Sequence, residues 1–380
     1  MEELILGELT ERKIGYGIVQ PGESTIGGVP VIKVNNIISG LKSIQDLDTT
    51  HPENDQKYRK TRLNGGEIII SVVGTIGKTA IVPMDFKGCN LVRATALIDI
   101  KDPILSRWVK YYIDSPKGQS YINGNLNTTV QPTLNIKSLV EMPIPFYGRE
   151  YAEKVVAILS KIDDKIENNR KINDNLEQQA SSLLSDWIST YPCRTYKLSD
   201  IGKYVSDKCD TGDLTSQNYI STENMLPNKK GIVGASNIPT GKVTCFKVDD
   251  ILIANIRPYF QKIWKADISG GCSTDVLCIR SCVESHSPIL YWILHQDAFF
   301  EYVMTGAKGC KMPRGDKQHI MNWTIDLPEP EYWADIATQL GAVDQRLAYN
   351  RVESINLSNL RDTLLPKLMS GELELNEIDC

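Results

Sequence analysis

The sequence lacks long apolar runs, and its cysteines and histidines lack the spacing of a metal site. No apolar stretch approaches the roughly 18–20 residues that cross a bilayer, and the first residues, MEELILGELTERK, lack the basic start and apolar core of a signal peptide. None of the nine cysteines forms a C-x-x-C pair, and four histidines do not complete a common zinc pattern. We therefore expect a cytoplasmic chain with reduced thiols, no metal and no membrane contact.

Motifs for catalysis are also missing. The run Gly74-Thr-Ile-Gly77-Lys78-Thr79 resembles a phosphate-binding loop, but Val72 stands where that motif needs its first glycine. No G-x-G-x-x-G follows an expected strand, and neither a G-x-S-x-G elbow nor the Asn-Pro-Pro-aromatic tetrapeptide of adenine methylation occurs. These absences predict a binding protein that is not an enzyme and holds no cofactor.

Charge is distributed in four blocks. The chain has 380 residues and a net charge of −5, which argues against a uniformly basic nucleic-acid binder. Residues 1–148 carry +1, residues 149–190 carry −2, residues 191–329 carry +1 and residues 330–380 carry −5. The alternation is a first sign of a repeat. With the duplication and the helical periodicity described next, it predicts a first globular domain at 1–148, a helical region at 149–190, a second globular domain at 191–329, and a second helical region with an acidic tail at 330–380.

The sequence contains an internal duplication. An ungapped offset of 181 residues pairs Leu159 with Leu340, Asp163 with Asp344, and Leu183-Leu184 with Leu364-Leu365. The globular blocks match more loosely, since Pro103-Ile-Leu recurs as Pro288-Ile-Leu and Leu6-Gly-Glu-Leu as Leu198-Ser-Asp-Ile. Offsets that drift between 181 and 192 are expected where loops differ in length between two copies of one fold.

The two helical blocks repeat apolar residues every three or four positions. This heptad period predicts two long helices that pack on each other, each with one polar position, Asn169 or Asn350, that fixes the register. We expect Pro366 to kink or end the second helix. The alternative is that each helix docks only on its own globular domain. The predicted helix–helix seam consists of Leu159, Ile162, Ile166, Asn169, Leu176, Leu340, Val343, Leu347, Asn350 and Leu357.

The globular blocks contain both helix and strand signals. Residues 68–73 and 251–254 are β-rich runs, whereas residues 108–113 and 289–293 have helical patterns. Strands and helices do not alternate as in a doubly wound sheet. The predicted fold class is α+β, with two similar globular domains separated by two long antiparallel coiled-coil helices in a pseudo-twofold repeat.

Basic clusters interleaved with aromatic and amide side chains suggest contact with DNA. Lys and Arg contact phosphates, and Arg, Lys, Asn and Gln are suited to base edges. A merely solvated basic loop is the alternative for any single cluster. The candidate DNA-binding residues are Lys57, Tyr58, Arg59, Lys60, Arg62, Lys78, Asn127, Thr128, Thr129, Gln131, Arg257, Tyr259, Lys262, Lys308, Lys311, Arg314 and Lys317.

The order of globular block, helix, globular block, helix resembles the specificity subunit of type I restriction–modification systems. The resemblance is carried by residues 219–226 (YISTENML), 249–252 (DDIL) and 364–373 (LLPKLMSGEL), and by the duplicated run that ends at Asp163 and at Asp344. It covers essentially the whole chain. Each segment alone is weak evidence for the family, but the order of the segments and their duplication are specific to it.

The resemblance implies a non-catalytic subunit. In that family each globular block is a target recognition domain that reads one half of a split, asymmetric site in double-stranded DNA, and the helices set the spacer. Two modification subunits and a restriction subunit are the implied partners, and they would supply S-adenosylmethionine, ATP and magnesium. Two alternatives stay open: a recognition subunit of another methyltransferase or nuclease class, and a coiled-coil adaptor without DNA binding. The target bases do not follow from the sequence.

Overall fold

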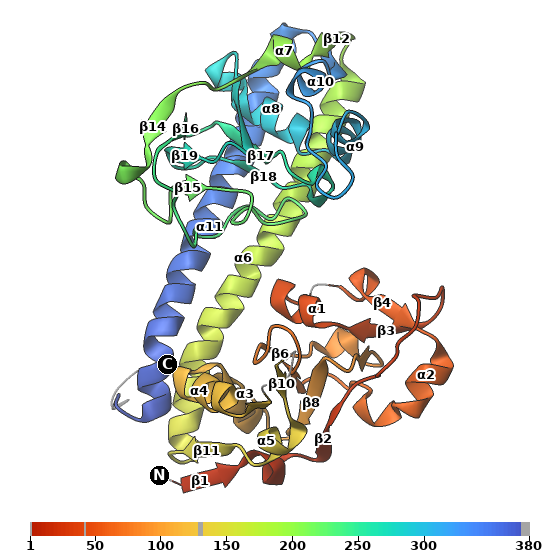
Figure 1. The fold of residues 1–380 in the computed structure, drawn as a ribbon, viewed down its shortest axis with the longest axis vertical. Helices are drawn as coiled ribbons and strands as arrows, with labels where there is room; N and C mark the ends of the chain where they lie inside the picture. Colours follow the sequence, from red (N-terminus) through yellow and green to blue (C-terminus); the bar gives the residue numbers. More distant parts are fainter. Residues whose placement is uncertain (1, 42, 128–131, 374–380) are drawn as a thin grey trace. The chain divides into compact units, whose positions relative to one another are not determined.

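The computed structural model describes residues 2–41, 43–127 and 132–373. Its contacts divide the chain into two compact units (Figure 1): unit 1 contains Met1–Ile166 with Ile355–Cys380, and unit 2 contains Glu167–Ser354. Two long helices, α6 (Arg149–Thr190) and α11 (Trp333–Ser370), each contribute one part to unit 1 and another to unit 2. The predicted division into two globular domains and two helical regions follows the sequence and not the spatial contacts, and it stays a prediction.

Unit 1 is built around a four-stranded antiparallel sheet with the order β2-β8-β5-β6. On β5, Ile68 and Ile70 pack into one apolar core with the helix that carries Trp108, whereas Ile69 packs into a second core with Ile32. Alternate side chains thus serve the two faces of the sheet, as the period of a strand requires. The main strands are β2 (Arg12–Tyr16), β5 (Ile68–Ser71), β6 (Thr79–Ile81) and β8 (Thr95–Asp99).

Smaller sheets and short helices complete unit 1. The order β4-β3-β7 combines an antiparallel pair with the parallel pair β3–β7, and β1 pairs with β11. These strands are β1 (Glu2–Ile5), β3 (Val29–Ile32), β4 (Asp48–Thr50), β7 (Asn90–Leu91) and β11 (Pro143–Phe146). The helices are α1 (Val34–Ser39), α2 (Pro52–Lys57), α3 (Pro103–Asp114), α4 (Pro116–Gly124) and α5 (Ile136–Val140).

Unit 2 repeats this plan. Its main antiparallel sheet has the order β13-β20-β17-β18, and on β17 Ile251 and Ile253 pack into one core while Leu252 and Ala254 pack into another. The bounds are β13 (Gly202–Tyr204), β17 (Ile251–Ala254), β18 (Ile263–Lys265) and β20 (Val276–Ser281). The helices are α7 (Leu198–Ile201), α8 (Ser287–Leu294), α9 (Asp297–Thr305) and α10 (Lys317–Met321).

The remaining strands of unit 2 confirm the internal repeat. β12 (Cys193–Lys197) pairs with β21 (Thr324–Pro328) as β1 pairs with β11. The second sheet has the order β14-β16-β19-β15 and contains the parallel pair β15–β19, which corresponds to β3–β7. Its strands are β14 (Lys208–Asp210), β15 (Tyr219–Ile220), β16 (Lys242–Phe246) and β19 (Gly270–Cys272). The mixed helix–sheet fold and its duplication are therefore as predicted.

The two long helices pack on each other antiparallel within each unit, and also on the globular part of that unit. In unit 1, Asp163 of α6 accepts from Arg361 of α11 at 3.0 Å. In unit 2, the amide of Asn169 donates to Glu353 at 2.7 Å, and that of Asn350 donates to Asn173 at 2.7 Å. Among the seam residues, Leu159, Ile162, Asn169, Leu340, Val343 and Asn350 are buried, and Ile166, Leu176, Leu347 and Leu357 are half-buried.

Pro366 does not end α11, which continues to Ser370. A proline inside a helix removes one hydrogen bond and costs about 3 kcal/mol. Leu365, Leu368 and Met369 are at most 5% exposed in the core of unit 1, and burying each such side chain contributes roughly 1.5–3 kcal/mol. The burial offsets the cost of the proline. The helix ends where Gly371 adopts a positive φ of 75°, a conformation that glycine favours after the last helical turn.

Candidate nucleic-acid interface

Two predicted basic segments of unit 2 meet in space. The turn between β17 and β18 carries Arg257 and Tyr259, and the loop between α9 and α10 carries Lys308, Lys311 and Arg314. Ile256 forms a β-bridge with Arg314, which also bridges to Lys308. The backbone N–H of Arg257 donates to the carbonyl of Pro313 at 2.8 Å. Residues about 50 positions apart in the sequence therefore form one surface.

The cations of this surface differ in how they are already paired. Arg314 pairs with Asp275 at 3.2 Å. Lys308 pairs with Asp316 at 2.7 Å and holds the pKa of that carboxyl down to about 2. Arg257 and Lys311 are exposed, and no carboxylate of the described residues pairs with either. These two cations are the ones in this surface that can bind a phosphate or a base edge without first breaking an ion pair.

Two further predicted residues of unit 2 have protein partners. The Lys262 ammonium donates to the carbonyl of Thr222 at 2.6 Å, and burial lowers the pKa of Lys262. The Lys317 ammonium lies 5.8 Å from the ring centroid of Tyr204. Lys262 therefore anchors the β17–β18 turn, whereas the side chain of Lys317 is exposed at the surface.

Unit 1 contains the same pair of segments. The turn between β5 and β6 carries Lys78, and the neighbouring hairpin consists of β9 (Leu126–Asn127) and β10 (Thr133–Leu134). Val73 bridges to Thr133, which corresponds to the bridge from Ile256 to Arg314 in unit 2. Lys78 and Asn127 are exposed. The predicted residues Thr128, Thr129 and Gln131 lie outside the described residues.

The cluster Lys57–Arg62 lies on another part of unit 1, on α2 and the short helix that follows it. Lys57, Arg59 and Lys60 are exposed, but Arg62 pairs with the buried Asp55. Tyr58 is half-buried and packs against a small apolar core. Within the described ranges of unit 1, no hydrogen bond or ion pair joins this cluster to the Lys78 turn. Whether all these residues touch DNA stays a prediction.

Sequence analysis missed two exposed apolar residues of the unit 2 surface. Phe260 is 37% exposed beside Tyr259, and Met312 is 50% exposed beside Lys311. The aromatic pair inside the run Arg-Pro-Tyr-Phe-Gln-Lys was a usable signal for Phe260. No signal marks Met312, because a single apolar residue in a loop is common on any surface.

Ion pairs attach the globular part of unit 2 to its long helices. Lys265 pairs with Asp344 of α11 at 2.7 Å, Arg351 with Asp267 at 2.5 Å, and Lys230 with Asp174 of α6 at 3.0 Å. Residues of all three pairs line a cavity of about 870 Å³. Burial raises the pKa of Asp344 to about 6, although Lys265 opposes that shift.

The equivalent acid in unit 1, Asp163, accepts from the Tyr111 hydroxyl at 2.9 Å. In unit 2, Asp344 accepts from the Trp292 indole N–H at 2.8 Å. Each acid thus connects a long helix to the globular part of its own unit. These contacts give both residues a structural role.

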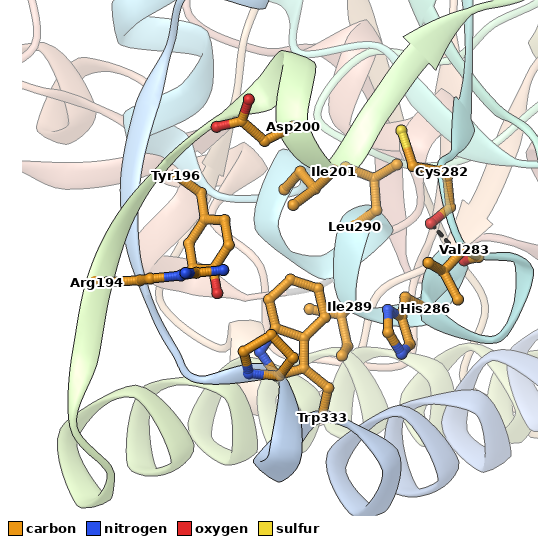
Figure 2. A pocket seen from close by; sticks show the side chains of 12 residues that line it. Arg194, Tyr196, Asp200, Ile201, Cys282, Val283, His286, Ile289, Leu290 and Trp333 are labelled. Carbon is orange, nitrogen blue, oxygen red and sulfur yellow. Dashed lines mark hydrogen bonds between the residues drawn. The ribbon is translucent and has the colours of Figure 1, made fainter.

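A smaller cavity of about 230 Å³ in unit 2 contains none of the predicted residues (Figure 2). Its walls include Tyr196, Trp333 and Ile289, and the Arg194 guanidinium lies 4.5 Å from the Tyr196 ring centroid. Glu329 already pairs with Arg194 at 3.5 Å. The cavity therefore suits an apolar group better than a phosphate.

The described residues contain no group of three or more His, Cys, Asp or Glu side chains placed to hold a metal ion. Within the same residues, no helix is both long and apolar enough to span a bilayer. In each unit, exposed cations or amides lie on two segments that a β-bridge joins: Lys78 and Asn127 in unit 1, and Arg257 and Lys311 in unit 2.

Comparisons with known proteins indicate the family that the chain resembles. Residues 3–178 match the family described as type I restriction modification DNA specificity domain. The type I restriction enzyme EcoBI specificity subunit of Escherichia coli is 25% identical over 218 residues, which cover 57% of this chain and 42% of that protein. The MjaIX specificity subunit of Methanocaldococcus jannaschii is 20% identical over 308 residues, which cover 73% of this chain and 71% of that protein.

The fold has a solved counterpart as well. The type I restriction–modification S subunit from M. genitalium superimposes with a TM-score of 0.52 at 17% identity, covering 97% of this chain and 95% of that one. The repeated fold and the matched region define a protein that carries a DNA specificity domain. Residues 3–178 match the DNA specificity domain family, and the chain is similar to the specificity subunits of type I restriction–modification systems.

Proposed function

We propose that this chain recognises a DNA sequence for a type I restriction–modification complex, with each globular region contacting one half of a split, asymmetric site. The observation that carries the proposal is the repeated pair of loops. In both units a strand–turn–strand segment is bridged to a second loop, and exposed cations or amides project there from Lys78 and Asn127 or from Arg257 and Lys311. Two such surfaces in one chain suit two half-sites.

The chain itself would be non-catalytic in this role. Two modification subunits would transfer the methyl group, and a restriction subunit would cleave the DNA. These partners would bring S-adenosylmethionine, ATP and magnesium. The natural compartment for this work is the cytoplasm, where DNA and the partner subunits meet. Similarity to specificity subunits of type I restriction enzymes supports membership in such a complex, and the composition of the complex is part of the proposal.

The long helices would set the spacer and bind the modification subunits. Large apolar side chains are exposed on both helices, although apolar residues face inward on most helices of this kind. Ile172, Tyr349 and Val352 in unit 2 are 37%, 57% and 47% exposed. Ile355 and Leu360 in unit 1 are 43% and 47% exposed. A partner helix that covered these side chains would remove them from water.

A genome-wide map of N6-methyladenine tests the proposal. The map would be made in cells that express this chain with a modification subunit, and in matched cells in which the chain is deleted. We expect a split, asymmetric motif that disappears with the chain. If no motif depends on the chain, and if the purified complex binds a library of duplexes without preference, the chain does not specify a DNA sequence.

A further inference from the structure

The β17–β18 turn of unit 2 displays two aromatic rings side by side. Tyr259 and Phe260 are 48% and 37% exposed, and their ring centroids lie 4.7 Å apart at an angle of 53°. They follow Pro258, which is buried, in a single turn of 3-10 helix. Side chains of this size are normally covered in a folded domain, because each exposes a large apolar area to water.

The backbone that carries the rings is strained at both ends. Arg257 before the turn and Gln261 after it adopt left-handed conformations, with φ of 52° and 49°. The corresponding turn in unit 1 begins and ends with glycines, Gly74 and Gly77, with φ of 79° and 81°. Glycine adopts this conformation without strain, whereas other residues rarely do. Unit 2 therefore keeps side chains where its duplicate uses glycine.

Hydrogen bonds from a second loop fix the turn. The backbone N–H groups of Asn228 and Lys229 donate to the carbonyls of Phe260 and Gln261 at 2.8 and 2.9 Å. The Arg257 N–H donates to Pro313 on the other side of the turn at 2.8 Å. A turn held in this way loses little conformational entropy when a ligand covers its rings.

The chemistry around the rings points to a polyanion with stacked aromatic groups. Arg257 and Lys311 flank the turn without carboxylate partners among the described residues, and Arg314 is held beside them by backbone contacts. The Lys262 ammonium lies 5.8 Å from the Phe260 ring centroid. Cations attract phosphates, and exposed aromatic faces stack on bases or enter between them.

We propose that Tyr259 and Phe260 form an aromatic wedge that enters the base stack of the half-site bound by unit 2 and unstacks one base step. The inference rests on the proposed function and adds a difference between the two units in how they bind their half-sites. The turn in unit 1 has Thr75 and Ile76 between its glycines and no aromatic ring. Unit 1 therefore reads its half-site without such a wedge.

Fluorescence of 2-aminopurine tests the wedge. The complex of this chain with its modification subunits would be bound to duplexes of the mapped site, each with one 2-aminopurine at a position other than the methylated adenines. We expect fluorescence to rise several-fold at one step in one half-site, and no such rise in the other. The double variant Tyr259→Ala/Phe260→Ala should lose the rise and bind roughly tenfold more weakly, whereas Phe260→Trp should retain it.

Tyr191→Ala is the matched control. Tyr191 is 40% exposed and stacks on Tyr332 in the same unit, away from the loops, so its removal should leave the fluorescence unchanged. Thermal denaturation of each variant reports whether it is folded. If the wild-type complex binds its site with no rise at any step, the wedge is wrong and the proposed function stands.

Two other outcomes are also decisive. If the wild-type complex binds no DNA at all, both the wedge and the proposed function fail. If the double variant binds DNA and unstacks it normally but no longer associates with the modification subunits, the aromatic pair is a protein contact and the wedge is again overturned.

Discussion

At the scale of single residues, substitution of Arg257 should affect folding stability and DNA binding in different ways. Its left-handed backbone costs about 1–2 kcal/mol in a non-glycine residue, and glycine takes the equivalent place in unit 1. Arg257→Gly should leave the free energy of unfolding unchanged or raise it by up to about 1 kcal/mol, since glycine's extra freedom in the unfolded chain cancels part of the gain. Loss of a bidentate arginine should cost roughly 1–3 kcal/mol of binding.

Denaturant unfolding and DNA titration measure the two effects separately. Arg257→Lys is the matched variant, because it keeps the charge and the strained backbone but loses the planar guanidinium. Gly74→Ala in unit 1 is the reverse control and should destabilise the protein by about 1–2 kcal/mol. Undiminished DNA affinity in Arg257→Gly would show that this side chain does not contact DNA.

The buried side chain of His295 predicts that the folded protein loses stability at acidic pH. The side chain lies between α8 and α9 and is buried, its Nε2 atom makes no hydrogen bond within the described residues, and burial lowers its pKa to about 3. Below pH 6.5 the unfolded chain binds a proton that the folded chain does not, so stability falls as the pH falls. From pH 7 to pH 5 this histidine should remove about 2 kcal/mol.

The measurement is urea unfolding at pH 7 and pH 5. Asp344 acts in the opposite direction, because its raised pKa of about 6 makes the folded chain bind a proton more readily between pH 4 and pH 6. Comparison with His295→Gln isolates the histidine, since Asp344 is common to both proteins. An equal loss of stability in the two proteins would contradict the assignment.

At the scale of elements, the exposed apolar side chains of α11 predict a partner. Tyr349→Ser with Val352→Ser should weaken association with the modification subunit at least tenfold without lowering the melting temperature, because neither side chain is buried in the chain itself. Size-exclusion chromatography or calorimetry would report the affinity. Ile26→Ser, at an exposed residue in a loop of unit 1, is the control. An equal loss of affinity in both variants would contradict the proposal that α11 binds the modification subunit.

At the scale of the whole molecule, the paired helices predict how the DNA site is divided. Removal of one heptad from each helix, at positions related by the 181-residue offset, should change the number of base pairs between the half-sites or abolish assembly. The bases within each half-site should stay the same, because the loops proposed to contact them are untouched. Methylation mapping of the shortened chain gives the answer, and altered bases with an unchanged spacer would contradict the role of the helices.

Sequence by itself determined the repeat, the long helices and the mixed fold. Periodicity is local information: a heptad pattern specifies a helix wherever it packs, and the 181-residue offset pairs Asp163 with Asp344 without any knowledge of their contacts. The same local patterns located β5, β17, α3 and α8. The local rule that a proline kinks or ends a helix did not give the end of α11, because the helix continues to Ser370 and buries Leu368 and Met369.

Tertiary structure decided which basic residues form a common surface and which already have an ion-pair or hydrogen-bond partner within the protein. Arg257 and Lys311 look alike in the sequence to Arg62 and Lys262, yet Asp55 pairs with Arg62 and a backbone carbonyl accepts from Lys262. Such partners come from distant segments, so no local pattern encodes them. The strained turn that carries Tyr259 and Phe260 likewise exists only because residues 228–229 and 313 hold it from two sides, and long-range contacts of this kind are fixed by the packed fold.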